Sequence, residues 1–414
     1  MYWSRRELLK ALAAGGAGLL GVGWAEYEAP AEKTNRYLVG LPAITQEDYE
    51  QRRERARRLM ARNKIDALYL TGGTSLVYFS GVNWHRSERL FAMLLPRKGE
   101  PVFVCPAFEE RRARELVGPK FEIRTWQEHE SPYRLVASLL QEWRLSTGRI
   151  GVEETVRYFE FRGLAEAAPQ LDLVSGDPVT HYCRGIKSKK ELRLQRAANE
   201  LTLSVYRSAL KRVREGMDET QVARLVASEF RKRGVSGGAL VLHGRNSAFP
   251  HGTRQRQPLR EGMVILVDGG CSVRGYRSDM TRTVVFGRPS ERQRRVWDVV
   301  KKAQSAALAA ARPGVPCGDI DAAARKVIVE AGFGPGYRYF THRLGHGIGL
   351  DGHEWPYLVK DNPLPLRPGM TFSDEPGIYI YGEFGIRLED IMHITEDGAA
   401  LFTPQCPSIS WPFA

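Results

Sequence analysis

Apolar and polar positions follow two different rhythms along the chain from about residue 35. A helical spacing predicts helices at residues 46–63, 109–116 and 133–143. Short apolar runs, typical of buried strands, lie at residues 66–70, 76–80, 91–95 and 101–105. Because helices and strands alternate here, we predict an α/β domain over residues 36–185.

A long charged helix at about residues 188–214 opens a second domain, which we place at residues 186–410. Two stretches of this domain repeat one pattern, R-E-G-M-V-I-L-V-D at 260–268 and R-P-G-M-T-F-S-D-E at 367–375. Similar turns and helices precede them, at 211–217 with 219–233 and at 311–315 with 320–330. This internal repeat predicts two similar α+β units about a pseudo-two-fold axis, whose equivalent residues meet at the seam.

A carboxylate closes each copy of the repeat, where the pattern predicts the end of a strand. Asp268 and Glu375 stand in these positions, and Asp279 and Glu389 follow them along the chain. A carboxylate beside a buried apolar run is costly unless it meets a cation. If the strands of Asp268 and Asp279 pair as an antiparallel hairpin, both side chains can lie on one face.

The segment between the copies contains a histidine, His346, with glycines on both sides, so the backbone can approach a ligand closely. Together with the four carboxylates it forms an oxygen-rich set without a thiolate. Such a set favours two divalent ions, Mn²⁺ foremost, with Co²⁺, Fe²⁺ or Zn²⁺ by availability. Two carboxylates can bridge ions roughly 3.5 Å apart, and a water between the ions becomes hydroxide near neutral pH. The sequence therefore predicts a two-metal hydrolytic site.

The composition of the chain argues against two features, a nucleic-acid partner and a disulfide framework. The formal charge of +13 is spread along the chain instead of being clustered with aromatic residues, which argues against a nucleic-acid partner. The five cysteines have no metal-binding or redox spacing, and their odd number argues against a disulfide framework. We expect them to be buried thiols.

The first residues predict an export signal that is separate from the fold. S-R-R-E-L-L-K at 4–10 resembles a bacterial twin-arginine signal, and the Gly/Ala-rich stretch at 11–25 is too short to span a bilayer. We assign residues 1–31 to this signal and expect export to the periplasm or cell envelope, without stable membrane insertion. The alternative is a chance Arg pair on a short helix of a cytoplasmic protein.

Several motifs, in their order and spacing, resemble those of the pita-bread metallopeptidases, which include methionine aminopeptidase, aminopeptidase P, prolidase and creatinase. They are V-D-G-G, Y-R-S-D-M-T-R-T, H-R-L-G-H-G-I-G, H-E, D-E-P-G-I-Y and I-R-L-E-D. The resemblance covers about residues 40–410 and implies an α+β fold. It implies that a creatinase/prolidase-type α/β N-terminal domain precedes the duplicated pita-bread domain and that the protein forms a homodimer.

The resemblance also implies a role for each matching residue. The metal ligands would be Asp268, Asp279, His346, Glu375 and Glu389. Asp279 and Glu389 would bridge the ions, with Asp268 on one ion and His346 and Glu375 on the other. Glu375 would also act as the general base that passes the proton of the attacking water to the leaving nitrogen.

Other matching residues would contact the substrate. His342 and His353 would hold the scissile carbonyl, the tetrahedral oxyanion or a prolyl carboxylate, and His251 would be a further catalytic histidine. Tyr379 and Arg387 would lie beside the ligands, where the arginine could pair with a substrate carboxylate or with neighbouring ligand acids. The simpler alternatives are a core position for Tyr379 and a loop position for His251.

The complete ligand set argues against creatinase, whose chemistry needs no metal, and the large N-terminal domain argues against methionine aminopeptidase. Gly345 and Glu354, beside the two histidines of H-G-I-G-L-D-G-H-E, resemble prolidase, whereas aminopeptidase P more often has Ser and Asp there. We therefore predict Xaa-Pro dipeptide hydrolysis by a metal-bridged hydroxide, with Glu375 as proton shuttle. The alternatives are an aminopeptidase P acting on longer peptides, a non-peptidase lyase and an inactive binding protein.

One loop of the first domain, W-H-R-S-E-R at 84–89, is unusually polar and aromatic. In this family the N-terminal domain commonly caps the site of the partner subunit. The resemblance thus implies that Trp84 and Arg86 help to select the N-terminus and the length of a proline-containing di- or oligopeptide. The alternative is an ordinary surface loop.

Overall fold

The computed structural model describes residues 37–413, and from Gly40 onward the chain forms one compact unit. The predicted signal segment 1–31 lies outside the described residues. Within them, each helix is too short or too polar to cross a membrane. All five cysteines fall in the described part and are buried and free, which confirms the prediction of buried thiols.

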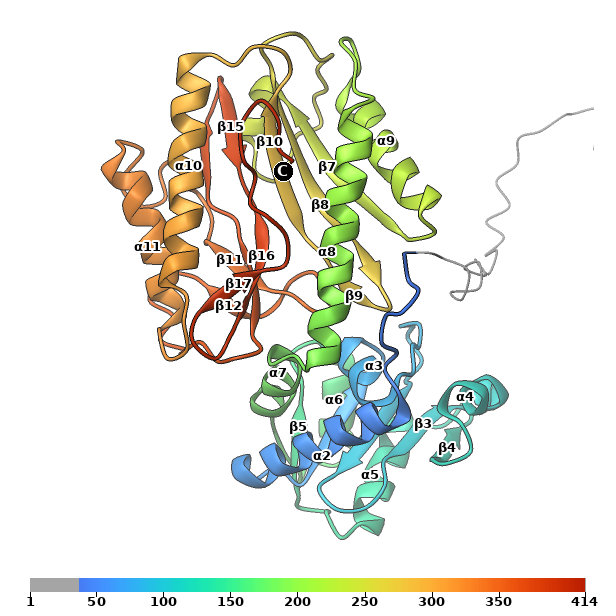
Figure 1. The fold of residues 1–414 in the computed structure, drawn as a ribbon. Coiled ribbons are helices and arrows are strands. Elements are labelled where there is room, and N and C mark those ends of the chain that lie inside the picture. The colour runs from blue at the N-terminus through green and yellow to red at the C-terminus, as the bar shows by residue number, and fades with distance from the viewer. Residues whose placement is uncertain (1–36, 414) are drawn as a thin grey trace, which may run out of the picture. The chain divides into compact units, whose positions relative to one another are not determined.

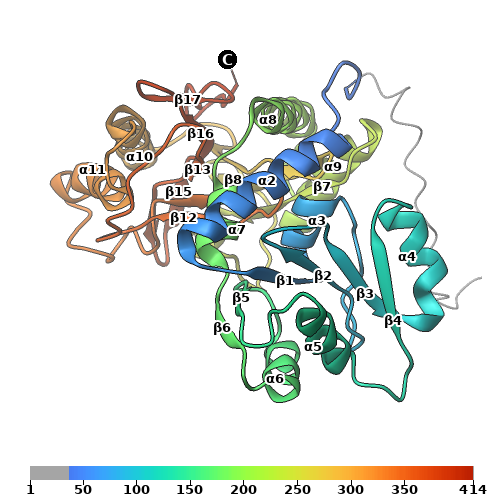
Figure 2. The ribbon, with the colours of Figure 1, turned by 90° about the horizontal axis from the view of Figure 1, so that it is seen from below.

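The first domain is built on a six-stranded sheet of order β4-β3-β2-β1-β5-β6 (Figure 2). Its strand β2 runs antiparallel to both neighbours, and the other pairs are parallel. The strands are β1 Ala67–Thr71, β2 Ala92–Pro96, β3 Val102–Pro106, β4 Glu122–Trp126, β5 Arg149–Val152 and β6 Asp172–Ser175. The helices are α2 Gln46–Asn63, α3 Thr74–Ser80, α4 Glu110–Val117, α5 Pro132–Glu142, α6 Tyr158–Ala167 and α7 Asp177–Gly185.

Two buried cores cover the two faces of this sheet. Leu68 and Met93 belong to the core that also contains side chains of α2, α3, α4 and α7. Tyr69 and Leu94, the next residues along the same strands, belong to the core beneath α5 and α6. This alternation follows from the two-residue period of a strand, and it explains why the strands read as continuous apolar runs.

One predicted strand of this domain is wrong, because residues 76–80 belong to helix α3. Most side chains of the run L-V-Y-F-S are buried, so the run has no polar face from which a helical period could be read. A short apolar run of this kind does not distinguish a buried helix from a buried strand. The other predicted strands and helices of the domain lie within one or two residues of the observed elements.

The second domain begins with the long helix α8 and contains two α+β halves. In Figure 1, α8 runs along β8, and α10 lies against α11. The first half comprises α8 Lys189–Leu210, α9 Glu219–Lys232, β7 Gly237–His243, β8 Val264–Val273, β9 Tyr276–Arg277 and β10 Met280–Val285. The second comprises α10 Glu291–Ala310, α11 Cys317–Glu330, β11 Gly345–Gly347, β12 Glu354–Leu358, β13 Thr371–Asp374, β14 Gly377–Ile380, β15 Phe384–Arg387, β16 Asp390–Ile394 and β17 Ala399–Leu401. The main sheets have the orders β10-β8-β7 and β12-β11-β13-β16-β17.

The predicted duplication is visible in the backbone turns before β8 and β13. In each turn the Met N–H donates to the Arg carbonyl three residues earlier, at 3.1 Å. Gly262 and Gly369 take φ values of 81° and 86° in these turns, a left-handed conformation that favours glycine. The shared R-x-G-M pattern therefore forms the same turn in each half.

The two halves are joined through the buried strand β10. Arg282 donates to Asp390 Oδ1 at 2.7 Å and to the Glu389 carbonyl at 2.7 Å. Thr283 Oγ1 donates to the Arg387 carbonyl at 2.6 Å. These bonds tie the strand after Asp279 to the segment that contains Glu389, so the carboxylates of the two halves lie close together at the seam.

Candidate metal centre

Antiparallel pairing puts the two aspartates of the first half on one face. Thr281 of β10 pairs with Asp268 of β8, and Asp279 precedes Thr281 by two residues. However, Asp268 does not end its strand as predicted. Strand β8 continues to Val273, because its last residues pair with the short strand β9.

The glutamates of the second half also face each other. Asp374 of β13 pairs with Asp390 of β16, and Glu375 and Glu389 are the next residues beyond this pair. Here the prediction that the carboxylate follows the end of a strand is correct, since β13 ends at Asp374.

The structure brings all five predicted ligands together. Their carboxylate oxygens and ring nitrogens lie within 4.8 Å of one another in three groups that share members. These groups are Asp268–Asp279–Glu389, His346–Glu375–Glu389 and Asp279–His346–His353. Asp279, His346 and Glu389 each belong to two groups, so these residues link the ligands of the two halves.

Burial raises the pKa values of two carboxyl groups in this cluster. Burial, and then the charge of Asp268, raise the pKa of Asp279 to about 7. Burial, and then the charge of Asp279, raise the pKa of Glu389 well above its usual value. Buried like charges are costly without a cation. The oxygen-rich donor set and its unbalanced negative charge therefore fit a pair of hard divalent ions.

The imidazole of His346 is oriented by its backbone neighbour. Its Nδ1 lies 3.0 Å from the Gly347 carbonyl and donates to it, so Nε2 faces Glu375 Oε1 at 3.3 Å. This is the orientation in which a neutral histidine presents a lone pair to a metal ion. Without a metal ion, burial would raise the pKa of Glu375, but the hydrogen bond and positive charge of a protonated His346 lower it.

Two hydroxyl residues that were not predicted support the ligands. Thr281 Oγ1 donates to Glu389 Oε2 at 2.7 Å. Ser373 Oγ accepts from the backbone N–H of His346 at 2.9 Å and donates to Glu375 Oε1 at 3.0 Å. Both residues stand two positions from a predicted ligand, Thr281 after Asp279 and Ser373 before Glu375. The strand period was thus the available signal for them.

A chain of hydrogen bonds leads from the first aspartate to a predicted substrate histidine. Arg387 pairs with Asp268 and donates from Nη1 to the Tyr379 hydroxyl at 2.7 Å. That hydroxyl lies 2.8 Å from His342 Nε2, and His342 Nδ1 lies 2.7 Å from the Arg343 carbonyl. Because a carbonyl only accepts, Nδ1 carries the proton, and Nε2 of the neutral ring accepts from Tyr379. Burial lowers the pKa of His342, which favours this neutral ring.

Comparison with known proteins identifies the family. Residues 193–396 match the model for metallopeptidase family M24, and residues 52–186 match the creatinase/prolidase N-terminal domain. A relative in Mycobacterium tuberculosis, "Probable dipeptidase PepE", is 36% identical over 374 residues, which are 89% of this chain and 98% of the relative. The chain belongs to metallopeptidase family M24. It is thus a metallopeptidase with the pita-bread fold, and its family implies divalent metal ions.

Solved structures agree with this assignment to family M24. The dipeptidase PepE of Mycobacterium ulcerans is 33% identical, with a TM-score of 0.82, over 88% of this chain and 98% of that one. A prolidase of Thermococcus sibiricus is 31% identical, with a TM-score of 0.79, over 86% of this chain and 97% of that one.

The remaining predicted histidines of this M24 peptidase border the cluster in different ways. His353 stacks on His346 with ring centroids 3.6 Å apart, and burial lowers its pKa. His251 is exposed in the loop after β7. The neighbouring Pro250 carbonyl accepts from Arg387 Nη1 at 3.2 Å, which ties this loop to the site. Tyr379 is buried, as the alternative core position required, but its hydroxyl joins the polar chain to His342.

In the predicted substrate loop, residues 84–89, Trp84 is buried and Arg86 is exposed. Trp84 is 6% exposed and stacks on Phe91 at 4.0 Å between ring centroids, so it is part of the domain core. Arg86 is exposed, and it donates to the Gly72 carbonyl and, at 3.0 Å, to Thr155 Oγ1. The proposed selection of peptides therefore falls to Arg86, and it stays a prediction.

Proposed function

We propose that this M24 peptidase hydrolyses Xaa-Pro dipeptides with two bound divalent ions, Mn²⁺ foremost. The observation that carries the proposal is the convergence of four carboxylates and two histidines, His346 and His353, in three overlapping groups. The relative described as a probable dipeptidase and the structural neighbour described as a prolidase support the dipeptide substrate. Glu354, which directly follows His353, supports the prolidase-like choice over aminopeptidase P.

The cluster supplies the groups that hydrolysis needs. When bound, a pair of divalent ions acts as a Lewis acid on a carbonyl oxygen and lowers the pKa of a water molecule. Glu375 accepts a hydrogen bond from the Ser373 hydroxyl at 3.0 Å, which favours its ionised form. We assign to it the acceptance of the proton from the attacking water and its delivery to the leaving proline nitrogen.

We assign different roles to the histidines beside the cluster. His342 uses both ring nitrogens within the protein, so we assign it to holding Tyr379 and, through that hydroxyl, Arg387. We assign contact with the oxyanion or the prolyl carboxylate to His353 and His251. A neutral His353 can donate one hydrogen bond to such an oxygen.

A substrate panel tests the proposal. The protein with added Mn²⁺ is given Ala-Pro, other Xaa-Pro dipeptides and Xaa-Pro-Pro peptides, with Glu375→Ala as the control. We expect the dipeptides to be cleaved best and the control to be inactive. Preference for the longer peptides would make the protein an aminopeptidase P. No hydrolysis of either class would favour a lyase or a binding protein and would overturn the proposal.

We also propose a homodimer in which Arg86 contributes to peptide selection. The expected results are a dimer mass in sedimentation and a changed ratio of dipeptide to tripeptide cleavage in Arg86→Ala. An unchanged ratio would remove Arg86 from the site.

Export by the twin-arginine route is a separate proposal that rests on the sequence. Residues 1–31 fused to a folded reporter should direct it out of the cytoplasm. The double substitution Arg5→Lys with Arg6→Lys should block this transport. A reporter that stays in the cytoplasm with the unchanged segment would favour the cytoplasmic alternative.

A further inference from the structure

Two histidines of the candidate centre are carried by one hairpin. Strand β11 contains His346, strand β12 begins at Glu354, and Gly347 pairs with Glu354 across the hairpin. The connecting segment, residues 348–353, ends at His353, whose ring stacks on that of His346. The position of this hairpin therefore sets the position of both imidazoles.

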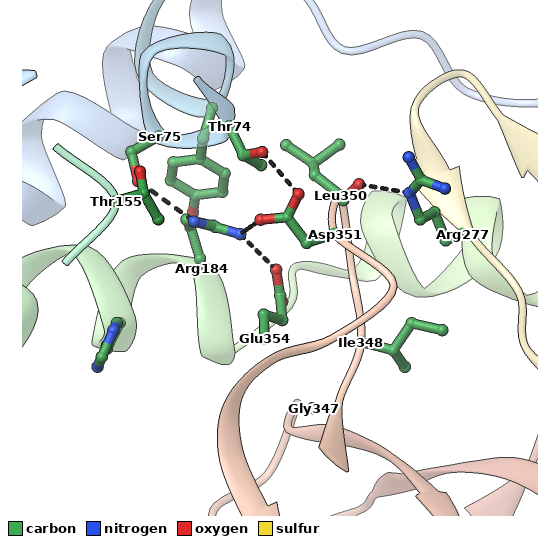
Figure 3. Close-up of polar contacts among 12 residues, drawn as sticks. Thr74, Ser75, Thr155, Arg184, Arg277, Gly347, Ile348, Leu350, Asp351 and Glu354 are labelled. Carbon is green, nitrogen blue, oxygen red and sulfur yellow. Dashed lines mark hydrogen bonds and ion pairs between the residues drawn. The ribbon is translucent and has the colours of Figure 1, made fainter. Parts of the chain in front are cut away.

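The N-terminal domain contacts the tip of the hairpin, which Arg277 of the second domain also holds by donating from Nε to the Leu350 carbonyl at 3.1 Å (Figure 3). Leu350 packs against the core that contains α2, α3, α4 and α7. Asp351 Oδ1 accepts from the Thr74 hydroxyl at 2.7 Å, and Asp351 Oδ2 pairs with Arg184 Nη2 at 2.5 Å. Thr74 begins α3 and Arg184 lies in α7, so two helices of the other domain hold one aspartate.

The base of the hairpin is held by the same arginine and by the lysine that follows α7. Arg184 Nη2 donates to Glu354 Oε2 at 2.8 Å, and Lys187 Nζ donates to Glu354 Oε1 at 2.7 Å (Figure 3 draws the first bond). Gly349 lies so close that a Cβ there would overlap the Glu354 carboxylate, so the hairpin is closed tightly over this ion pair.

The three side chains of this ion-pair group at the base of the hairpin are buried. Glu354, Arg184 and Lys187 are 7%, 9% and 5% exposed, so both carboxylate oxygens of the glutamate find their donors inside the protein. A buried ion pair contributes little net stability against its desolvation, but removing one partner leaves an uncompensated charge. Such a group fixes geometry more than it stabilises the fold.

The same short segment also reaches the second glutamate of the centre. The Lys187 N–H donates to the Gly369 carbonyl at 2.8 Å, in the turn that leads to β13 and Glu375. Gly185 packs directly against Trp355 of β12. Residues 184–187 thus contact the β11–β12 hairpin, which carries His346, and the turn that leads to β13 and Glu375.

We propose that Arg184 and Lys187 are positioning residues for the metal centre. Through Asp351 and Glu354 they fix the β11–β12 hairpin, and so they hold His346 ready for a metal ion and His353 beside it. The inference deepens the proposed function, because it takes His346 as a ligand. It makes the N-terminal domain part of the machinery of its own subunit.

The test uses the full chain after chelation, with Mn²⁺ as the probe. Arg184→Met and Glu354→Gln each remove one partner, and Glu229→Gln is the matched control. Glu229 is equally buried, 6% exposed, and its ion pairs involve Arg212, Lys232 and Arg233, outside the hairpin. Hydrogen exchange of residues 345–358 and the affinity for Mn²⁺ are measured in the wild type and in every variant, and neither readout needs a substrate.

We expect faster exchange of the hairpin and an affinity for Mn²⁺ lower by about 10- to 100-fold in both variants, with the control like the wild type. Arg184→Lys should recover part of the affinity, since its ammonium can reach one of the two carboxylates. The proposal is overturned if the hydrogen exchange of the hairpin or the affinity for Mn²⁺ in Arg184→Met or in Glu354→Gln equals that of the Glu229→Gln control. If wild-type protein binds Mn²⁺ but cleaves no Xaa-Pro peptide, the proposed function fails while this test stands.

Discussion

The buried pair of Arg282 and Asp390 gives the sharpest prediction about how the two halves are held together. Both residues are completely buried, and Arg282 Nη2 lies 2.7 Å from Asp390 Oδ1. Arg282 also donates to the Glu389 carbonyl, so the pair lies directly behind a candidate ligand. Asp390→Asn keeps the shape of the side chain and removes its charge.

The expected cost of Asp390→Asn follows from the burial of the arginine. Burial lowers the pKa of Arg282 and the charge of Asp390 raises it, but an arginine is not deprotonated in a protein even without its partner, so the guanidinium stays charged after the substitution. Breaking a buried pair by removing one charge costs about 3–5 kcal/mol, because the other charge is left uncompensated. We expect a loss of this size in the free energy of unfolding, measured by urea denaturation of the chelated protein.

The exposed pair of Arg292 and Glu383 provides the control for this measurement. Its two hydrogen bonds, at 2.6 and 2.8 Å, are similar in length to the 2.7 Å bond of the buried pair, but both side chains are largely in solvent. Water screens such a pair, so Glu383→Gln should leave the urea midpoint essentially unchanged. A loss in Asp390→Asn no larger than that in Glu383→Gln would refute the argument from burial.

Three further predictions concern the centre and the first domain. In the chelated protein the pKa of Asp279 is about 7, above its value in the unfolded chain, so between about pH 4 and 7 the folded state keeps a proton that the unfolded state loses. Thermal melts should therefore show the stability of the fold falling as pH rises through this range, and added Mn²⁺ should abolish the fall. A fall that persists with Mn²⁺ would contradict this. Tyr379→Phe leaves His342 Nε2 without its donor and should cost about 1–3 kcal/mol in urea unfolding; a neutral result would contradict the assigned tautomer. Trp84→Ala should cost about 3–5 kcal/mol, as for a core aromatic, whereas a stable variant would place the ring outside the core.

The sequence predicted the duplicated half and its ligands because both depend on local rules. The turn before each strand requires a glycine at the same place, so the pattern around Gly262 and Gly369 recurs. Pairing with a two-residue period then determines which carboxylates share a face. These constraints act over a few residues, and they can be read from one chain.

Features that depend on packing between distant segments were not predicted. The run at 76–80 has no period of its own, and it forms helix α3 within the core of the domain. The donor of His342 lies in strand β14, at Tyr379, and a partner of Glu354 lies in another domain, at Arg184. Spacing along the chain carries no information about such contacts.

The central claim is that peptide hydrolysis needs the metal-binding cluster and its glutamate. The most direct test follows Ala-Pro hydrolysis by the chelated protein as Mn²⁺ is added one equivalent at a time, with Glu375→Gln in parallel. Removing a general base of this kind lowers kcat by about 10²- to 10⁴-fold. We predict activity that appears with Mn²⁺, levels off near two equivalents per chain and is lost to that extent in Glu375→Gln. Full activity before Mn²⁺ is added, or in Glu375→Gln, would contradict the account.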